Sequence, residues 1–497
     1  MQESLHEKVR STPFLAGIGS GILRGAEKLK MRFWTNSESI AGIRRFSGQL
    51  WLLLLIHTLF NERGFAVSVN FSLYVRRIFE VSSDSEIAVY YTVWRLCGHA
   101  IRIVSGFVVE MMGLRRALIM GCIVMTVGQI LFSMSSYLWL TLGSLFWLIT
   151  LGSVFFEQAA DLLPLYYFRD RPTTTIVFSA MYASMNLGAL ASLVVTYISL
   201  KVFDGWGGYR VMMSIAAMVS VIGSLSSIFY NTPDLLLEAQ DTRPRASFST
   251  VFKVFLERQF WQLFALLFSM TGVWSIYRFV DLMLIIYLVR IEPSISYAPL
   301  LAINTILIIP LVSACGVLTN RGLTPYTWIV IGVGISATSL VWLWLIPGSP
   351  IFPTVLMMIQ VTIGEAISAP KIQEWVSSYS PEGKKAIYKG WLPLAQAPGE
   401  FFVGILSSAL LTRYCPEQTF TLELDNTDAT NSADEVYLNV ARTMWLWTML
   451  FALSSLVLLL VLRPFITYEP KPKHIRNEIE MEPATKGPAF IDEPEPS

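Results

Sequence analysis

Long apolar runs alternate with short polar connections along most of the chain. Each run holds roughly 20 residues or more, the length that an α-helix needs to cross a hydrocarbon layer of about 30 Å. The pattern therefore predicts twelve transmembrane helices, near residues 48–75, 87–110, 115–134, 137–163, 174–200, 208–230, 259–289, 295–318, 326–346, 351–379, 385–411 and 438–465.

The charges of the connections predict which side of the membrane each one faces. Lys and Arg gather in the cytoplasmic loops of membrane proteins. If the N-terminus lies inside, the inside connections hold the larger share of basic residues, and the largest outside connection, 412–437, is acidic. An even number of helices then places both termini in the cytoplasm. The inside connections hold Arg115, Arg116, Arg169, Arg171, Arg243, Arg245, Lys253, Arg321, Lys384, Lys385 and Lys389.

The longest internal connection divides the apolar runs six and six. Two bundles around a cavity at the membrane midplane are the architecture of alternating-access carriers. We therefore expect an all-α membrane protein of two six-helix bundles. Its expected parts are a cytoplasmic tail at 1–46, a bundle at 47–230, a cytoplasmic linker at 231–258, a bundle at 259–467 and a disordered cytoplasmic tail at 468–497.

Composition narrows the class of protein. Only 15% of the 497 residues are charged, against about 25% in soluble domains, so most of the chain does not face water. A net charge of +1 gives no reason to expect nucleic acid as a partner. The four cysteines are scattered, and no metal-spaced histidine cluster or phosphate-binding glycine loop occurs. We expect a multi-pass integral membrane protein in the lipid bilayer, without cofactor or metal, and not an enzyme.

Charged residues inside the predicted helices are the candidate functional residues, because a charge at the centre of a membrane helix costs roughly 2.5–3.5 kcal/mol on insertion scales. Glu62 and Arg63 stand side by side in the first helix. Arg95, His99 and Arg102 share one face of the second helix. That basic stripe is expected to line a cavity or to meet carboxylates; alternatively, its two arginines lie near the helix ends and extend to the membrane surface.

Carboxylates occur in three further helices. Glu157 and Asp161, one turn apart, are expected to hold a cytoplasmic gate closed against arginines of the next loop, with substrate binding as the alternative. Arg278 and Asp281 are three residues apart, so they either pair with each other or line the cavity.

The tenth helix carries Glu365 and Glu374 on either side of Pro370. Nine residues turn an ideal helix by about half a revolution. The two carboxylates should point in opposite directions unless the proline kinks the helix. Asn186 in the fifth helix is a polar residue that either joins helices or contacts a ligand.

The turn after the second helix resembles a known signature. Gly106, Glu110, Gly113, Arg115 and Arg116 are similar to the loop pattern G-x-x-x-D-x-x-G-R-R of the major facilitator superfamily, with one residue inserted before the arginines. In that superfamily the acid and the basic residues of this loop lock the inside-closed arrangement. The resemblance implies such a gating role for Glu110, Arg115 and Arg116.

Three stretches resemble the proton-coupled oligopeptide transporter family. Glu62 and Arg63 match the end of E-x-x-E-R-F in the first helix, with Leu59 in place of the first acid. Residues 178–188 are similar to F-S-x-F-Y-x-S-I-N-x-G, and residues 364–381 to G-E-x-x-x-S-x-x-x-x-E-F-x-Y-x-x-x-P, with Ser377 in place of the tyrosine.

The resemblance implies roles for particular residues. Glu374, with Trp375 beside it, inherits the position that receives the amino terminus of a peptide. Arg63 and Glu62 inherit the positions that hold the carboxyl end and couple transport to protons. Glu157 stands where the family has a lysine, which reverses the charge.

We therefore expect a secondary transporter that moves a small polar solute, such as a di- or tripeptide or an amino-acid-like molecule, by alternating access with proton coupling. Candidate substrate-binding residues are Arg63, Arg95, Asn186, Glu374 and Trp375. Candidate proton-coupling residues are Glu62, Asp281 and Glu365. Two alternatives stay open: a proton-independent facilitator or carrier of organic anions or nitrate-like ions, and a transporter-like receptor or scaffold that transports nothing.

Overall fold

The computed structural model describes residues 44–81, 83–168, 171–203, 206–233, 252–318, 323–380, 385–416 and 427–467, and they form helices and short connections. Nearly all of the expected N-terminal tail, the whole expected C-terminal tail and most of the expected linker lie outside these residues. The first half holds α4 (Gly48–Phe79), α5 (Asp84–Met112), α6 (Leu114–Met134), α7 (Leu138–Gly143), η2 (Ser144–Ile149), α8 (Thr150–Leu162), η3 (Leu163–Tyr166), α9 (Arg171–Val202) and α10 (Trp206–Ile228).

The second half has the same kind of helices but more interruptions. It holds η4 (Val254–Leu256), α13 (Arg258–Ser269), α14 (Thr271–Phe279), η5 (Val280–Leu284), α15 (Ile285–Ile291), α16 (Tyr297–Leu318), α17 (Pro325–Thr338), α18 (Val341–Leu345), α19 (Ile351–Tyr379), α20 (Lys385–Trp391), η6 (Leu392–Gln396), α21 (Ala397–Tyr414) and α22 (Thr427–Ile466).

Each of the twelve predicted ranges contains helix in the structure. Ten helical segments of the described residues are long and apolar enough to cross a membrane. The two remaining ranges correspond to α5, which carries several charges, and to α16, whose described apolar stretch is Tyr297–Val312. The count of twelve crossings therefore stays a prediction, as does the side on which each terminus lies.

Local sequence explains where several helices begin. The hydroxyl of Ser47 accepts a hydrogen bond of 3.2 Å from the amide of Leu50 and caps α4. Thr324 caps α17 in the same way, with Pro325 in the first turn. Gly113 joins α5 to α6 at φ +83°, a conformation that side-chain-bearing residues rarely adopt. The loop signature seen in the sequence is therefore a tight turn between two helices.

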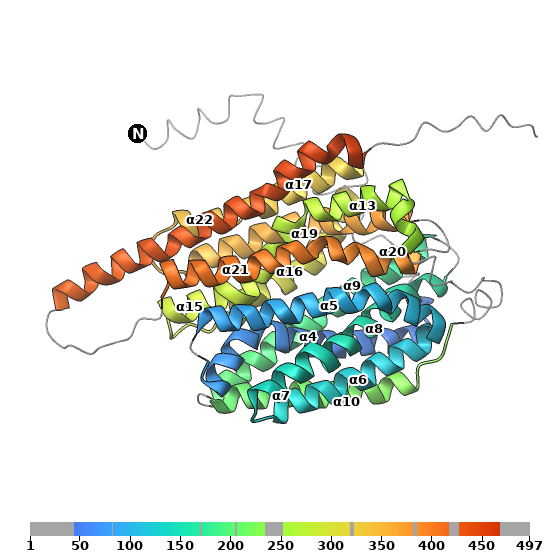
Figure 1. The fold of residues 1–497 in the computed structure, drawn as a ribbon, viewed down its shortest axis with the longest axis horizontal. Helices are drawn as coiled ribbons and strands as arrows, with labels where there is room; N and C mark the ends of the chain where they lie inside the picture. Colours follow the sequence, from blue (N-terminus) through green and yellow to red (C-terminus); the bar gives the residue numbers. More distant parts are fainter. Residues whose placement is uncertain are drawn as a thin grey trace, which may run out of the picture.

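The two halves lie side by side, with α4–α10 together on one side and α13–α22 on the other (Figure 1). Large apolar side chains on the outside of the bundle are exposed: Trp139 is 73% exposed and Phe229 is 72% exposed. Exposed apolar surface of this extent is compatible with lipid rather than water as the surrounding solvent. Several charged side chains are instead buried between helices, where they form the candidate site.

Within the first half, α4 and α9 touch closely at Gly188. A Cβ atom built on Gly188 would lie 2.4 Å from the carbonyl oxygen of Thr58 and 2.8 Å from the amide nitrogen of Glu62. Only glycine leaves room for the α4 backbone at this point. This contact fixes the turn of α4 that carries Glu62 and Arg63.

Candidate functional site

Four charged residues form a cluster between the two halves, which we call the central ion cluster: Arg95, Arg278, Asp281 and Glu400. Arg95 of α5 lies 3.2 Å from Oε1 of Glu400 on α21, and Nε of Arg278 on α14 lies 2.9 Å from the same oxygen. Glu400 is only 5% exposed. One carboxylate oxygen thus joins two guanidinium groups that come from opposite halves.

Asp281 extends the cluster to the first two helices. Its Oδ2 lies 3.5 Å from Nη1 of Arg278, accepts a hydrogen bond of 2.7 Å from Ser68 of α4, and accepts one of 3.4 Å from Tyr91 of α5. Of the two alternatives for Arg278 and Asp281, the structure shows the pairing along one helix. The pair is also part of a larger contact between the halves.

Two polar atoms beside the cluster have no hydrogen-bond partner among the described residues. They are Oε2 of Glu400 and Nδ1 of His99, both buried. A buried polar atom without a partner loses the hydrogen bonds that water would supply. Both atoms could therefore contact a polar solute. Arginine is well suited to hold a carboxylate, because its planar guanidinium donates two parallel hydrogen bonds.

A second polar centre surrounds Glu365 on α19. Tyr182 of α9 donates a hydrogen bond of 3.0 Å to Oε1 of Glu365, and Asn304 of α16 donates one of 3.1 Å to Oε2. Tyr182 belongs to the first half and Glu365 to the second. Asn186, one turn after Tyr182, is buried and donates 2.9 Å to the Tyr182 carbonyl oxygen, so it contacts its own helix.

Glu62 and Arg63 are both buried on α4, at 4% and 5% exposure. Neither carboxylate oxygen of Glu62 has a hydrogen-bond partner among the described residues. Nη2 of Arg63 points to the sulfur of Met125 on α6. The structure therefore places this pair inside the first half, apart from the hydrogen bonds of the central ion cluster.

The candidate gating residues lie at one end of the first half. Glu157 of α8 forms an ion pair with Arg102 of α5, and Asp161 lies half-buried one turn further on. The arginines of the adjacent loop, expected as their partners, lie at positions whose side chains are not described. The basic stripe of α5 thus meets carboxylates at two places, Glu400 and Glu157.

The loop after α5 contacts the end of α10 through Arg115. Nε of Arg115 donates a hydrogen bond of 2.6 Å to the carbonyl oxygen of Tyr230, and Nη2 donates one of 3.5 Å to the carbonyl oxygen of Ile228. Arg115 therefore caps the end of α10. Arg116 is exposed. The side chain of Glu110 is not among those described. A gating role for these three residues stays a prediction.

The last two sequence candidates are on α19. The side chain of Glu374 is not described. Trp375 stacks on Tyr379 at a ring distance of 5.3 Å and meets Tyr326 of α17 at 6.1 Å. The described contacts of Trp375 therefore lie within the second half.

The opposite end of the molecule holds a contact that the sequence did not indicate. Asp84, at the start of α5, lies 2.8 Å from Nη2 of Arg290 on α15 and also pairs with Arg76 of α4. Nη1 of Arg290 donates 2.6 Å to the carbonyl oxygen of Cys415. We call Arg76, Asp84 and Arg290 the end clasp, because they join the two halves at this end.

Glu400 was missed although a signal was present. It follows Pro398 and Gly399 inside an apolar run, so the rule that drew attention to Glu62 applies to it equally. Asp84 and Arg290 carried no such signal, because charges at the ends of membrane helices are common.

Comparisons with known proteins agree with this architecture. A family model described as Major Facilitator Superfamily matches residues 171–404. A solved POT family transporter in complex with 5-aminolevulinic acid is 15% identical, with a TM-score of 0.61 over 84% of this chain and 96% of that chain. The POT family transporter PepTSo is 14% identical, with a TM-score of 0.61 over 86% and 99%. No curated protein matches the chain.

The chain has the major facilitator fold. The expected resemblance to the major facilitator superfamily, and within it to the structures of POT family transporters, is confirmed. The chain is a multi-pass integral membrane protein, as this fold and the ten long apolar helices among the described residues indicate. At 12–16% identity, the solved structures establish the fold and not the substrate.

Proposed function

We propose that this major facilitator protein is a secondary transporter that moves a small polar solute by alternating access. The observation that carries the proposal is the sharing of Glu400 by Arg95 and Arg278 between the two halves. Buried charges persist in membrane helices where they have partners and a function. In this proposal residues 47–230 and 259–467 are the two moving bundles, with twelve crossings and both termini in the cytoplasm.

The charges favour a solute that carries a carboxylate. A carboxylate entering beside Glu400 would compete for Arg95 and Arg278 and weaken their hold across the halves. An amino group at the other end of the solute would meet a carboxylate, for which Glu374 is the candidate. Solved relatives in fold bind 5-aminolevulinic acid and a conjugated peptide. The substrate class is therefore amino-acid-like molecules or short peptides.

Proton coupling is part of the proposal. Three carboxyl groups are suited to it: Glu62, whose oxygens have no partner among the described residues, Asp281 in the cluster, and Glu365 between Tyr182 and Asn304. Protonation of a paired carboxylate removes its attraction for the neighbouring arginine. The halves could then separate at one end and close at the other.

The test is uptake by purified full-length protein in liposomes. Radiolabelled dipeptides and 5-aminolevulinic acid are offered with and without an inward proton gradient. We expect saturable uptake of at least one of them, increased by the gradient and abolished by a protonophore. Uptake that is unchanged by the protonophore would establish a facilitator instead. Absence of uptake of all of them under every gradient would contradict the proposed substrate class.

A second candidate is a carrier of organic anions. It is favoured by the same observation, since two arginines share a single carboxylate oxygen. Competition separates the candidates. If the protein is an organic-anion carrier, an unlabelled dicarboxylate without an amino group should inhibit uptake of the labelled solute. If it is an amino-acid or peptide carrier, an unlabelled zwitterion should inhibit that uptake instead.

A further inference from the structure

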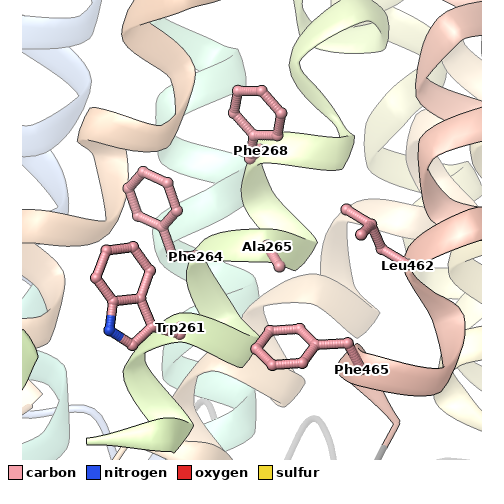
Figure 2. A pocket seen from close by; sticks show the side chains of 6 residues that line it. All are labelled: Trp261, Phe264, Ala265, Phe268, Leu462 and Phe465. Atoms are coloured by element: carbon pink, nitrogen blue, oxygen red, sulfur yellow. The ribbon is translucent and has the colours of Figure 1, made fainter. Parts of the chain in front are cut away.

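An apolar groove runs along the outer surface of the second half, between α13 and α22. It has a volume of about 360 Å³ and is lined by Trp261, Phe264, Ala265, Phe268, Leu462 and Phe465. Figure 2 shows Leu462 and Phe465 directed from α22 toward the α13 turn that carries Ala265. The groove exists because Ala265 is the one small residue among these bulky side chains.

The groove follows one stripe of α13. Trp261, Ala265 and Phe268 are spaced four and three residues apart, so they lie on one face of the helix. At 1.5 Å per residue the stripe is about 10 Å long. That length fits within one leaflet, whose hydrocarbon is about 15 Å deep. The two helices meet at the groove's end, where Gln262 donates 3.0 Å to the carbonyl oxygen of Phe465.

Basic side chains flank the same end of the groove. Arg258 is exposed in the first turn of α13, one turn before Trp261 on the same stripe. Arg463 is exposed in the last turn of α22, next to Leu462. Glu257, which precedes Arg258 in the chain, accepts a hydrogen bond of 2.6 Å from Tyr388.

Trp261 indicates that this end lies at the membrane surface. The residue is 44% exposed, and its indole N–H donates a hydrogen bond of 2.8 Å to the carbonyl oxygen of Phe255. Tryptophans with an apolar body and a satisfied polar edge are enriched where lipid tails meet headgroups. The apolar groove therefore runs into the membrane from a basic rim at its surface.

We propose that this groove is a binding site for one acyl chain of an anionic phospholipid, whose headgroup contacts Arg258 and Arg463. The tail fills the space above Ala265, and the phosphate lies at the basic rim. In the topology proposed above, this is the cytoplasmic leaflet, which carries the anionic lipids that attract basic residues. Each arginine near an anionic surface contributes about 1 kcal/mol to binding. The two arginines together should therefore raise the affinity for an anionic lipid about 30-fold over that for a neutral lipid.

The test measures phospholipid retained by the full-length protein in detergent by native mass spectrometry. Phosphatidylglycerol is titrated against phosphatidylcholine. We expect one phosphatidylglycerol per chain to be retained that phosphatidylcholine does not displace. Ala265→Trp, which fills the groove, should abolish this retention. The double variant Arg258→Gln and Arg463→Gln should reduce the preference for phosphatidylglycerol by about 30-fold while leaving the groove intact.

Two control variants keep the test decisive. Ile405→Trp adds the same ring at a 53% exposed position on α21 outside the groove. Arg413→Gln removes an exposed charge at the far end of α21. Both should retain phosphatidylglycerol as the unchanged protein does. Equal binding of both lipids, or unchanged binding by the double variant, would overturn the proposal. A dimer dissociated by Ala265→Trp would assign the groove to a second copy and overturn it too.

Discussion

Arg95 on α5 lies 3.2 Å from Glu400 on α21, an ionic contact between the two halves of the molecule. Arg278 reaches the same oxygen from α14 at 2.9 Å. The Glu400 side chain is only 5% exposed, so water does little to screen its attraction for the two arginines. The contact is therefore both a structural link and the point at which a charged solute could act.

Glu400→Gln should destabilise the protein and abolish transport. Removing one partner from a fully buried ion pair costs roughly 3–5 kcal/mol, which is the upper bound here because Arg278 keeps Asp281 as a partner and Arg95 is 24% exposed. Two arginines would lose their common partner. Thermal unfolding of the detergent-solubilised protein and uptake in liposomes measure the two effects. Glu80→Gln, at an exposed position, is the control. A Glu400→Gln protein with unchanged stability and uptake would remove the cluster from both roles.

Glu365→Gln should uncouple transport from protons while preserving the fold. Glutamine retains an oxygen that can accept a hydrogen bond, but it cannot be charged. We expect loss of gradient-driven uptake with retained exchange of labelled for unlabelled solute. Tyr182→Phe removes the hydrogen bond to Glu365, worth about 1 kcal/mol, without removing the titratable group. It should keep the response to the gradient. If Glu365→Gln still concentrates solute under a gradient, the proton site lies elsewhere.

Asp84→Asn should open the end clasp. The change weakens the hydrogen bonds to Arg290 and Arg76, and bonds to charged groups are worth about 1.5–3 kcal/mol. The open state should become about 10- to 100-fold more populated. Cys415 is fully buried at this end, and its carbonyl oxygen accepts from Arg290.

The rate at which a membrane-impermeant maleimide labels Cys415 reports this opening, in a background where Cys97, Cys122 and Cys315 are replaced by serine or alanine. The exposed Glu86→Gln, two residues from Asp84, should label at the unchanged rate. Equal rates for Asp84→Asn and the control would show that the clasp does not restrain this end.

Gly188→Ala should lower stability by about 1–3 kcal/mol through overpacking. The new methyl group would lie 2.4 Å from the Thr58 carbonyl oxygen, which belongs to the backbone and cannot move alone. Gly64→Ala, on the partner helix α4, meets no atom within 4 Å and is the matched control. Thermal unfolding compares the two. Equal unfolding midpoints for the two variants would show that α4 and α9 can move apart at Gly188 without loss of stability.

The helices could be predicted from sequence because their signal is local. A run of about 20 apolar residues reports a membrane helix regardless of what surrounds it. The breaks within the second half were not predicted. The predicted helix at 259–289 is divided at Met270 between α13 and α14 and contains the π-helical turn η5. Apolar composition continues through these irregularities, so it gives no sign of them.

The site could be predicted only in part. The stripe of Arg95, His99 and Arg102 follows from helical spacing, and it does meet carboxylates. Its partners could not be named, because Arg95 and Glu400 are 305 positions apart and only packing of the two halves brings them together. Glu62 and Arg63 were candidates because a charge in a membrane helix is costly in free energy. That cost identifies the charged residue but not its neighbours.

The composition of the central ion cluster has an electrical consequence. Its two arginines and two carboxylates sum to zero net charge. Moving one elementary charge through a potential of 100 mV takes about 2.3 kcal/mol. An isolated arginine displaced across the membrane field would therefore make the empty carrier's return depend on voltage. In the proposed transport cycle the cluster lies at the contact between the two bundles, and because its charges sum to zero we expect the unloaded protein to reset at nearly the same rate in polarised and depolarised membranes.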